Sequence, residues 1–145
     1  MKKEGRFNDS PRRKAREISL QVLFQREFTP EMSVDASLKY FRGYISAPDE
    51  AWGYAETLLN GVDARRDEID RFIRDSSLNW KIERISPVDL CILRQSVFEM
   101  ISDNVPFKVA IDEAVELAKK YGSTESAHFI NGILDDVHKR RSMIC

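Results

Sequence analysis

Residues 105–122 read VPFKVAIDEAVELAKKYG and carry the clearest helical pattern of the chain. Apolar residues recur every three or four positions after Pro106, and Gly122 follows the last of them. This spacing places the apolar side chains on one face of an α-helix, and a glycine directly after such a stripe is typical of a helix end. The stripe consists of Phe107, Ala110, Ile111, Ala114, Leu117, Ala118 and Tyr121.

The rest of the chain carries the same helical period between similar start signals. Ser10-Pro11 and Ser86-Pro87 are typical of a helix N-cap followed by its first residue, and residues 88–101 are apolar on most sides. No run alternates strictly between apolar and polar residues, and no hairpin signal occurs. The sequence therefore predicts an all-α fold of about seven helices, with residues 88–101 central in the packing. The expected helices lie around residues 12–27, 34–44, 49–62, 69–75, 88–101, 107–121 and 125–140.

The domain organisation follows from length and composition. A chain of 145 residues with 42% hydrophobic and 32% charged residues is expected to form one compact domain. We expect this domain over residues 12–145, behind a basic flexible arm of residues 1–11. Two packed helical bundles, about residues 12–78 and 80–145, would build it, because the connection between them is too short and too apolar for a flexible linker.

Several classes of protein are excluded by what the chain contains. No apolar run approaches the roughly 20 residues of a membrane span, and no apolar segment of a signal peptide follows the N-terminal charges. Cys91 and Cys145 have no metal-ligand spacing, and the two histidines lie ten residues apart on one expected helix. We therefore expect a cytoplasmic protein that contacts no membrane, has no metal, cofactor or catalytic residue, and is not an enzyme.

Charge is distributed unevenly along the chain. Residues 1–16 hold seven Lys or Arg against two acids, a net of +5, whereas residues 17–145 hold 16 basic and 22 acidic residues, a net of −6. Positive charge concentrated at one end and presented by a helix attracts a polyanion. Nucleic acid is the first candidate partner. The candidate nucleic-acid contacts in this run are Arg12, Arg13, Lys14 and Arg16.

Phe24 is a candidate base-stacking residue on the same helix. At 100° per residue it lies about 200° from Val22 and off the main apolar stripe. Single-stranded RNA is commonly held by aromatic side chains together with basic grooves, so an off-stripe phenylalanine fits that chemistry. The alternative is that Phe24 packs against the second helix.

Four segments together resemble the NusB family of bacterial transcription antitermination factors. Residues 12–24, RRKAREISLQVLF, are similar to the opening helix of the family, and residues 85–100 to its central helix. Residues 105–119 are close to the family signature P-x-x-V-x-I-N-E-A-x-E-L-A-K, with Asp112 in place of its asparagine. Residues 126–134, which include FINGIL, are similar to the C-terminal signature.

This resemblance implies an all-helical fold of two small bundles and a function in transcription. It implies binding of boxA-type single-stranded RNA together with NusE, a small-subunit ribosomal protein, within an RNA polymerase antitermination complex that supports ribosomal RNA transcription. The RNA surface of the family joins the first helix to the start of the last one. Phe129, which is offset from Ile130 on the last expected helix, is therefore a further candidate RNA contact.

Two acidic residues are candidates for the protein partner. The resemblance places that contact on the second half of the chain, where Asp89 and Glu125 stand at expected helix starts. The alternative for both is compensation of the helix dipole, worth about 0.3–1 kcal/mol. The alternative function for the whole chain is a purely protein-binding helical module that acts as a homodimer.

Two residues of the expected core also call for an explanation. Arg94 is surrounded in sequence by Leu90, Leu93 and Val97, and a buried arginine needs a partner, so we expect a carboxylate from another helix. Gly132 lies inside an expected helix, where glycine costs roughly 1 kcal/mol relative to alanine. Close approach of another helix is the expected reason.

Overall fold

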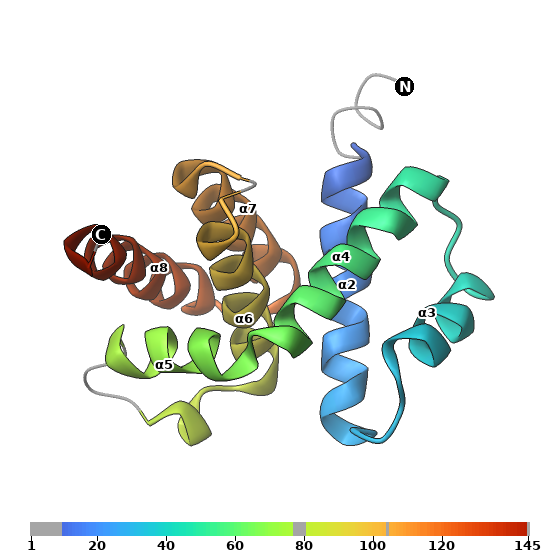
Figure 1. The fold of residues 1–145 in the computed structure, drawn as a ribbon, viewed down its shortest axis with the longest axis horizontal. Coiled ribbons are helices and arrows are strands. Elements are labelled where there is room, and N and C mark those ends of the chain that lie inside the picture. Colours follow the sequence, from blue (N-terminus) through green and yellow to red (C-terminus); the bar gives the residue numbers. More distant parts are fainter. Residues whose placement is uncertain (1–9, 77–80, 104, 145) are drawn as a thin grey trace. The chain divides into compact units, whose positions relative to one another are not determined.

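The computed structural model describes residues 10–76, 81–103 and 105–144, and over this part of the chain it is helical without a strand (Figure 1). The prediction of an all-α fold is confirmed. The described residues form seven α-helices and one short 3-10 helix, η1, in the order α2 (Pro11–Phe28), α3 (Val34–Arg42), α4 (Asp49–Ala64), α5 (Arg66–Ser76), η1 (Ile82–Arg84), α6 (Pro87–Ile101), α7 (Phe107–Tyr121) and α8 (Ser126–Ile144).

Contacts divide the chain into two units, Met1–Gly61 and Val62–Cys145. The division falls within α4 and not near residue 79, because α5 packs against α6 and α8 and so joins the second unit. Most of the basic arm expected at residues 1–11 lies outside the described residues. No helix of the described part is both long and apolar enough to cross a bilayer.

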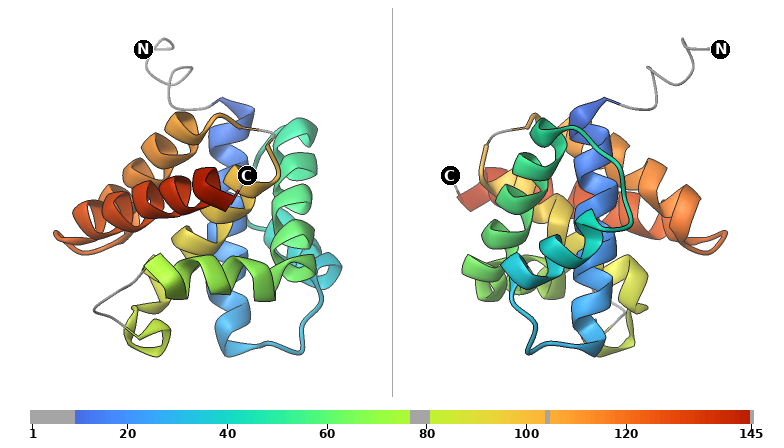
Figure 2. Two further views of the ribbon diagram at one scale, coloured as in Figure 1. Left: turned by 60° about the vertical axis from the view of Figure 1, so that its left-hand side comes forward. Right: turned by 90° about the vertical axis from the view of Figure 1, so that its right-hand side faces the viewer.

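The first unit is built on α2. Ser10 caps this helix, since its Oγ accepts a hydrogen bond from the Arg13 backbone N–H at 3.2 Å, and Pro11 occupies the first helical position. The apolar stripe of α2, formed by Ala15, Ile18 and Val22, is buried. α3 lies beside the C-terminal half of α2, where the Ser37 hydroxyl approaches the Gln25 side chain at 3.4 Å (Figure 2).

The second unit is organised around α6. This helix contacts α5, α7 and α8, and every residue from position 89 to position 101 is buried. Such all-round burial explains why residues 88–101 are apolar on most sides, and the prediction of a central helix is confirmed for this unit. Ser86 caps α6 by accepting a hydrogen bond from the Asp89 backbone N–H at 3.2 Å.

Arg94 finds its expected partner on another helix. Its Nε lies 2.9 Å from Oδ1 of Asp70 on α5, and one terminal nitrogen lies 3.0 Å from Oδ2. The two side chains are only 10% and 15% exposed. This paired geometry ties α5 to the central helix.

Gly122 ends α7 as predicted, but a left-handed backbone is not the reason for glycine there. Its φ and ψ are −97° and −169°, an extended conformation that any residue adopts. A Cβ at this position would lie 2.6 Å from the Ser126 hydroxyl oxygen, far inside van der Waals contact. Glycine is therefore required by the close approach of the first turn of α8.

The explanation expected for Gly132 is wrong. This residue is exposed on α8, and a Cβ there would meet no atom of the described residues within 4 Å. No described helix approaches it closely, so packing of helices does not account for the glycine.

Candidate nucleic-acid and partner interface

The candidate residues form two groups, one in each unit. The basic run and Phe24 all lie on α2 in the first unit, whereas Asp89, Glu125 and Phe129 lie in the second. Each group is described within its own unit.

The four basic residues of α2 differ in their exposure. Arg12 is exposed, Arg13 and Lys14 are half-buried, and Arg16 is buried, with only 6% of its surface exposed. The helix turns by 100° per residue, so Arg12 and Arg16 share one face, and the shift from exposed Arg12 to buried Arg16 follows the helix away from its start. The accessible cations of this run are therefore Arg12, Arg13 and Lys14.

Arg12 and Arg16 share an aromatic neighbour that the sequence did not indicate. The Cζ atom of Arg12 lies 3.9 Å from the centroid of the Tyr54 ring, and that of Arg16 lies 5.9 Å from it. Tyr54 stands near the start of α4, about 40 residues further along the chain. Only the tertiary packing of α4 on α2 brings these three side chains together.

Phe24 is on the solvent side of α2. Its side chain is 37% exposed, and its ring packs edge-to-face on Phe28, with centroids 5.2 Å apart. Phe28, one turn further on, is 65% exposed. The ring of Phe24 thus retains accessible area at which a base could stack, although Phe28 covers part of it.

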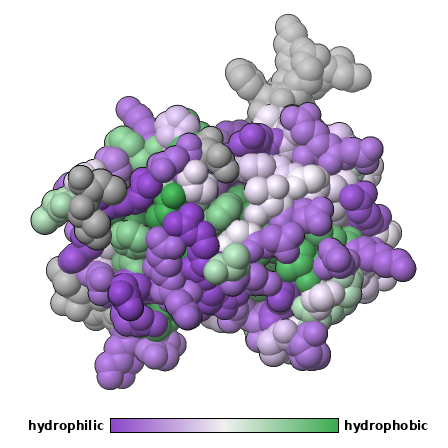
Figure 3. Space-filling view, in the orientation of Figure 1, coloured by the Kyte–Doolittle hydropathy of each residue, from purple (hydrophilic) through white to green (hydrophobic). Residues whose placement is uncertain are grey.

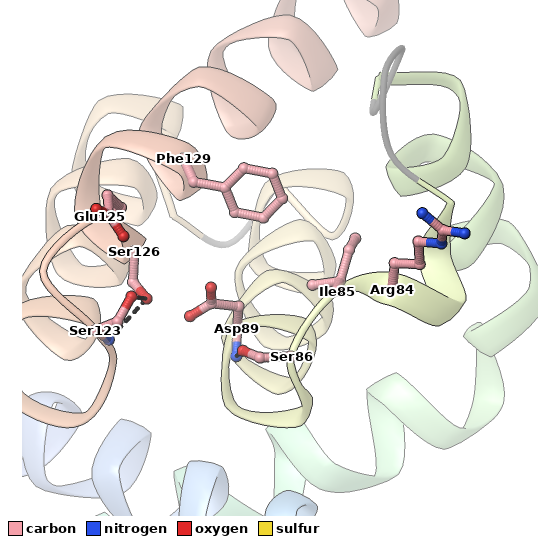
Figure 4. Close-up of a pocket in the computed structure, with 8 residues that line it drawn as sticks. All are labelled: Arg84, Ile85, Ser86, Asp89, Ser123, Glu125, Ser126 and Phe129. Carbon is pink, nitrogen blue, oxygen red and sulfur yellow. Dashed lines mark hydrogen bonds between the residues drawn. The ribbon is translucent and has the colours of Figure 1, made fainter.

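A pocket of about 380 Å³ in the second unit collects the remaining candidates (Figure 4). Three of its eight lining residues, Asp89, Glu125 and Phe129, are candidates from the sequence. In Figure 4 the Asp89 carboxylate and the Phe129 ring point into the space between α6 and α8. The other lining residues are Arg84, Ile85, Ser86, Ser123 and Ser126.

Asp89 carries an unsatisfied polar atom in this pocket. The residue is 9% exposed, and its Oδ1 is buried without a hydrogen-bond partner among the residues that the structure describes. Arg84, the one basic residue of the lining, points away from it in Figure 4. A buried acceptor without a donor costs about 1–3 kcal/mol, so a donor from a bound molecule would be stabilising here.

The opposite wall is formed by the start of α8. Glu125, immediately before α8, is exposed, and its backbone carbonyl accepts the first helical hydrogen bond from Phe129 at 3.1 Å. The Ser126 hydroxyl accepts a hydrogen bond from the Ser123 backbone N–H at 2.9 Å, which fixes the turn after Gly122. The pocket therefore combines an aromatic ring with two carboxylates held on rigid helix starts.

Helix dipoles remain an alternative role for both acids. Asp89 lies in the first turn of α6, and Glu125 precedes α8, so each also compensates a helix N-terminus. The unpaired oxygen of Asp89 is the feature that dipole compensation alone does not explain.

Figure 3 shows polar side chains over most of one face, with apolar side chains reaching the surface in patches. The described residues hold no group of three His, Cys, Asp or Glu side chains that could bind a metal ion. The helical fold, the basic helix and the acidic pocket together are typical of a small helical protein that acts by binding.

Comparison with known proteins identifies the family. A model of the NusB family matches residues 13–139. A transcription antitermination protein NusB from Bdellovibrio bacteriovorus is 45% identical over 130 residues, which cover 88% of this chain and 95% of that protein. The chain belongs to the NusB family of transcription antitermination factors, whose role is regulatory and not enzymatic.

Solved structures agree with this assignment. NusB from T. maritima is 31% identical, with a TM-score of 0.79 over 90% of this chain and 92% of that one. A chain in the crystal structure of the antitermination factors NusB and NusE in complex with dsRNA is 26% identical. Its TM-score is 0.78 over 90% of this chain and 97% of that one. The resemblance seen in the sequence motifs is confirmed.

Proposed function

We propose that this protein binds boxA-type single-stranded RNA together with the ribosomal protein NusE, in an RNA polymerase antitermination complex that supports ribosomal RNA transcription in the cytoplasm. The observation that carries the RNA part is the accessible basic start of α2, where Arg12, Arg13 and Lys14 offer three cations within one helical turn. The solved complex of related factors with NusE and dsRNA supports the choice of partners.

We assign binding of the protein partner to the second unit, Val62–Cys145. NusE, as a ribosomal protein, is expected to be basic, and Lys or Arg side chains carry the donors that the buried Asp89 oxygen lacks. The pocket of about 380 Å³ has room for such a side chain, and Glu125 adds a second carboxylate at its edge. Phe129 offers a ring to a base or to the stem of a basic side chain.

The RNA contact is tested by the salt dependence of binding. Replacement of Arg13 and Lys14 by alanine should remove about two phosphate contacts and flatten the log–log slope of affinity against salt by about 1.4, since each single-strand contact contributes about 0.7. Fluorescence anisotropy with a boxA-containing RNA, measured with and without NusE, gives the slope. Lys119 and Lys120 on α7, replaced in the same way, are the matched control and should leave it unchanged.

Aromatic variants separate stacking from charge in the same assay. Phe24→Ala and Phe129→Ala should each weaken binding by about 1–3 kcal/mol at every salt concentration with little change in slope. Phe107→Ala is the control, because that ring is similarly exposed, at 42%, and stacks on His138.

In the salt-dependence experiment, a log–log slope for the Arg13/Lys14 variant equal to that of the wild type would show that the basic run is solvated surface.

The form of the RNA is a further arm of this test. A duplex of the same sequence is compared with the single strand, because the related complex contains dsRNA. Tighter binding of the duplex would contradict the single-strand proposal. Absence of binding to either RNA, with or without NusE, would favour the purely protein-binding homodimer.

Charge reversal tests the partner pocket. Asp89→Lys and Glu125→Lys should weaken NusE binding while circular dichroism shows unchanged helical content, because each variant would repel a basic partner. Asp89→Asn keeps the shape of the buried side chain and should also weaken binding, so a folding defect of the lysine variant does not decide the result.

The control for this pair is Asp67→Lys. Asp67 is an exposed acid in the first turn of α5, so its reversal removes the same dipole compensation outside the pocket. Equal NusE affinities for the wild type and all pocket variants would remove Asp89 and Glu125 from the interface.

A further inference from the structure

The contact between α2 and α4 places two arginines against one tyrosine ring. Arg12 and Arg16 are one turn apart on α2, and both Cζ atoms lie within 6 Å of the Tyr54 centroid, at 3.9 and 5.9 Å. Distances in this range allow cation–π attraction, which is electrostatic and strongest when the guanidinium lies over the ring face. Figure 1 shows α4 passing across α2.

The Tyr54 ring offsets the repulsion between the positive charges of Arg12 and Arg16 on α2. Like charges at positions i and i+4 of a helix face each other and destabilise it. Arg16 keeps only 6% of its surface, so water screens its charge poorly. The negative face of the Tyr54 ring lies next to both cations and lowers the cost of holding them on one face.

Stacking on a ring leaves an arginine able to bind phosphate. A guanidinium carries its five N–H donors in its own plane, so a ring against its flat face does not block them, and phosphate is bound through two of them in parallel. Arg12 is the exposed member of the pair and has the shorter distance to the ring. Its long side chain is thereby held in one region instead of sampling many rotamers.

We propose that Tyr54 is a positioning residue for RNA binding, which holds Arg12, with Arg16 behind it, ready to contact the phosphate backbone. This inference rests on the proposed function, because it assigns a role to Tyr54 within the same basic surface. Tyr54 acts through the arginines and needs no contact of its own with the RNA.

The test uses the full chain and the boxA-containing single-stranded RNA. Tyr54→Leu removes the ring and keeps an apolar side chain, and it should weaken binding about two- to fivefold, the range expected for an exposed cation–π contact. Tyr54→Phe keeps the ring and should bind like the wild type. Arg12→Ala should lose less affinity in the Tyr54→Leu background than in the wild type, because the two residues act together.

A second readout does not depend on RNA. The order parameter of the Arg12 Nε–Hε group, measured by NMR relaxation, should fall in Tyr54→Leu and stay high in Tyr54→Phe. Tyr44→Leu is the matched control, since Tyr44 is a 75% exposed tyrosine outside the basic run, and it should change neither readout. Thermal midpoints are compared to confirm that all variants are folded.

The outcomes separate the two proposals. If the wild type binds RNA with the expected salt slope but Tyr54→Leu binds equally well, or Tyr54→Phe is as weak as Tyr54→Leu, the role of Tyr54 is overturned and the proposed function stands. If the wild type binds no RNA, the proposed function fails and this inference fails with it. Additive losses for Arg12→Ala and Tyr54→Leu also count against the coupling.

Discussion

Truncation of Leu93 to alanine should lower the free energy of unfolding by about 2–5 kcal/mol. Leu93 is 0% exposed at the middle of α6, the helix that contacts α5, α7 and α8. The substitution removes apolar contacts and leaves a cavity that rigid neighbouring helices fill only in part. Urea unfolding followed by circular dichroism measures the change as a shift of the midpoint at constant slope.

The control for this experiment is Lys119→Ala on α7. Its side chain is 62% exposed, and its ion pair with Glu116, at 3.6 Å, lies on the surface. This substitution should change the free energy of unfolding by no more than roughly 0.5 kcal/mol. Equal urea midpoints for the two variants would show that α6 is not the central helix of its unit.

The helices were predictable because local signals and burial agree along most of the chain. Serine-proline pairs at positions 10–11 and 86–87 start α2 and α6 in the structure as they do in the sequence. α7 covers Phe107–Tyr121, the limits that its apolar stripe predicted. The sequence predicts the third helix over residues 49–62, and in the structure α4 continues two residues further, to Ala64.

From the sequence it could be predicted that a buried charged residue needs a partner, but not which residue that partner is. The sequence required a carboxylate for Arg94, but it did not indicate Asp70, 24 residues earlier. Asp103 adopts a positive φ of 61° in the turn before α7, and both its carboxylate oxygens lie 3.0 Å from Arg141 near the C-terminal end. No local sequence pattern predicts the Asp70–Arg94 or the Asp103–Arg141 pair, because these residues approach each other only when the helices pack.

The candidate site shows the same limit. The density of positive charge in the sequence identified the basic run. The sequence did not predict that Arg16 is buried, because its exposure depends on the packing of α4 against α2. Asp89, Glu125 and Phe129 were each suggested by helix position or family resemblance, and the structure places all three on one pocket. Tyr54 carried no signal in the sequence, since a tyrosine on an amphipathic helix is ordinary.

The Asp70–Arg94 pair gives the other large expected effect on stability. Asp70→Ala should lower the free energy of unfolding by about 3–5 kcal/mol, because removal of one partner from a buried ion pair leaves a poorly solvated charge. Both side chains are at most 15% exposed, and the two hydrogen bonds join α5 to α6 at 2.9 and 3.0 Å. Chemical denaturation measures the loss.

The chain offers a matched pair for comparison. Arg65 and Glu68 make two hydrogen bonds of nearly the same lengths, 2.8 and 3.0 Å, but their side chains are 37% and 48% exposed. Glu68→Ala should therefore cost only about 0–1 kcal/mol, since water screens both charges and solvates the arginine that is left. The two pairs have nearly the same hydrogen-bond lengths, but they differ in burial and in that only the Asp70–Arg94 pair joins two helices, so the difference between the variants measures what burial and the tertiary position add.

A double variant separates that cost from the attraction within the pair. Asp70→Leu with Arg94→Met replaces both charges by apolar side chains, and it should recover most of the stability lost in Asp70→Ala, because the desolvation of Arg94 no longer has to be offset. A double variant as unstable as Asp70→Ala would show that the attraction itself holds α5 on α6. A loss in Asp70→Ala no larger than in Glu68→Ala would show that water reaches Arg94 despite its low exposure.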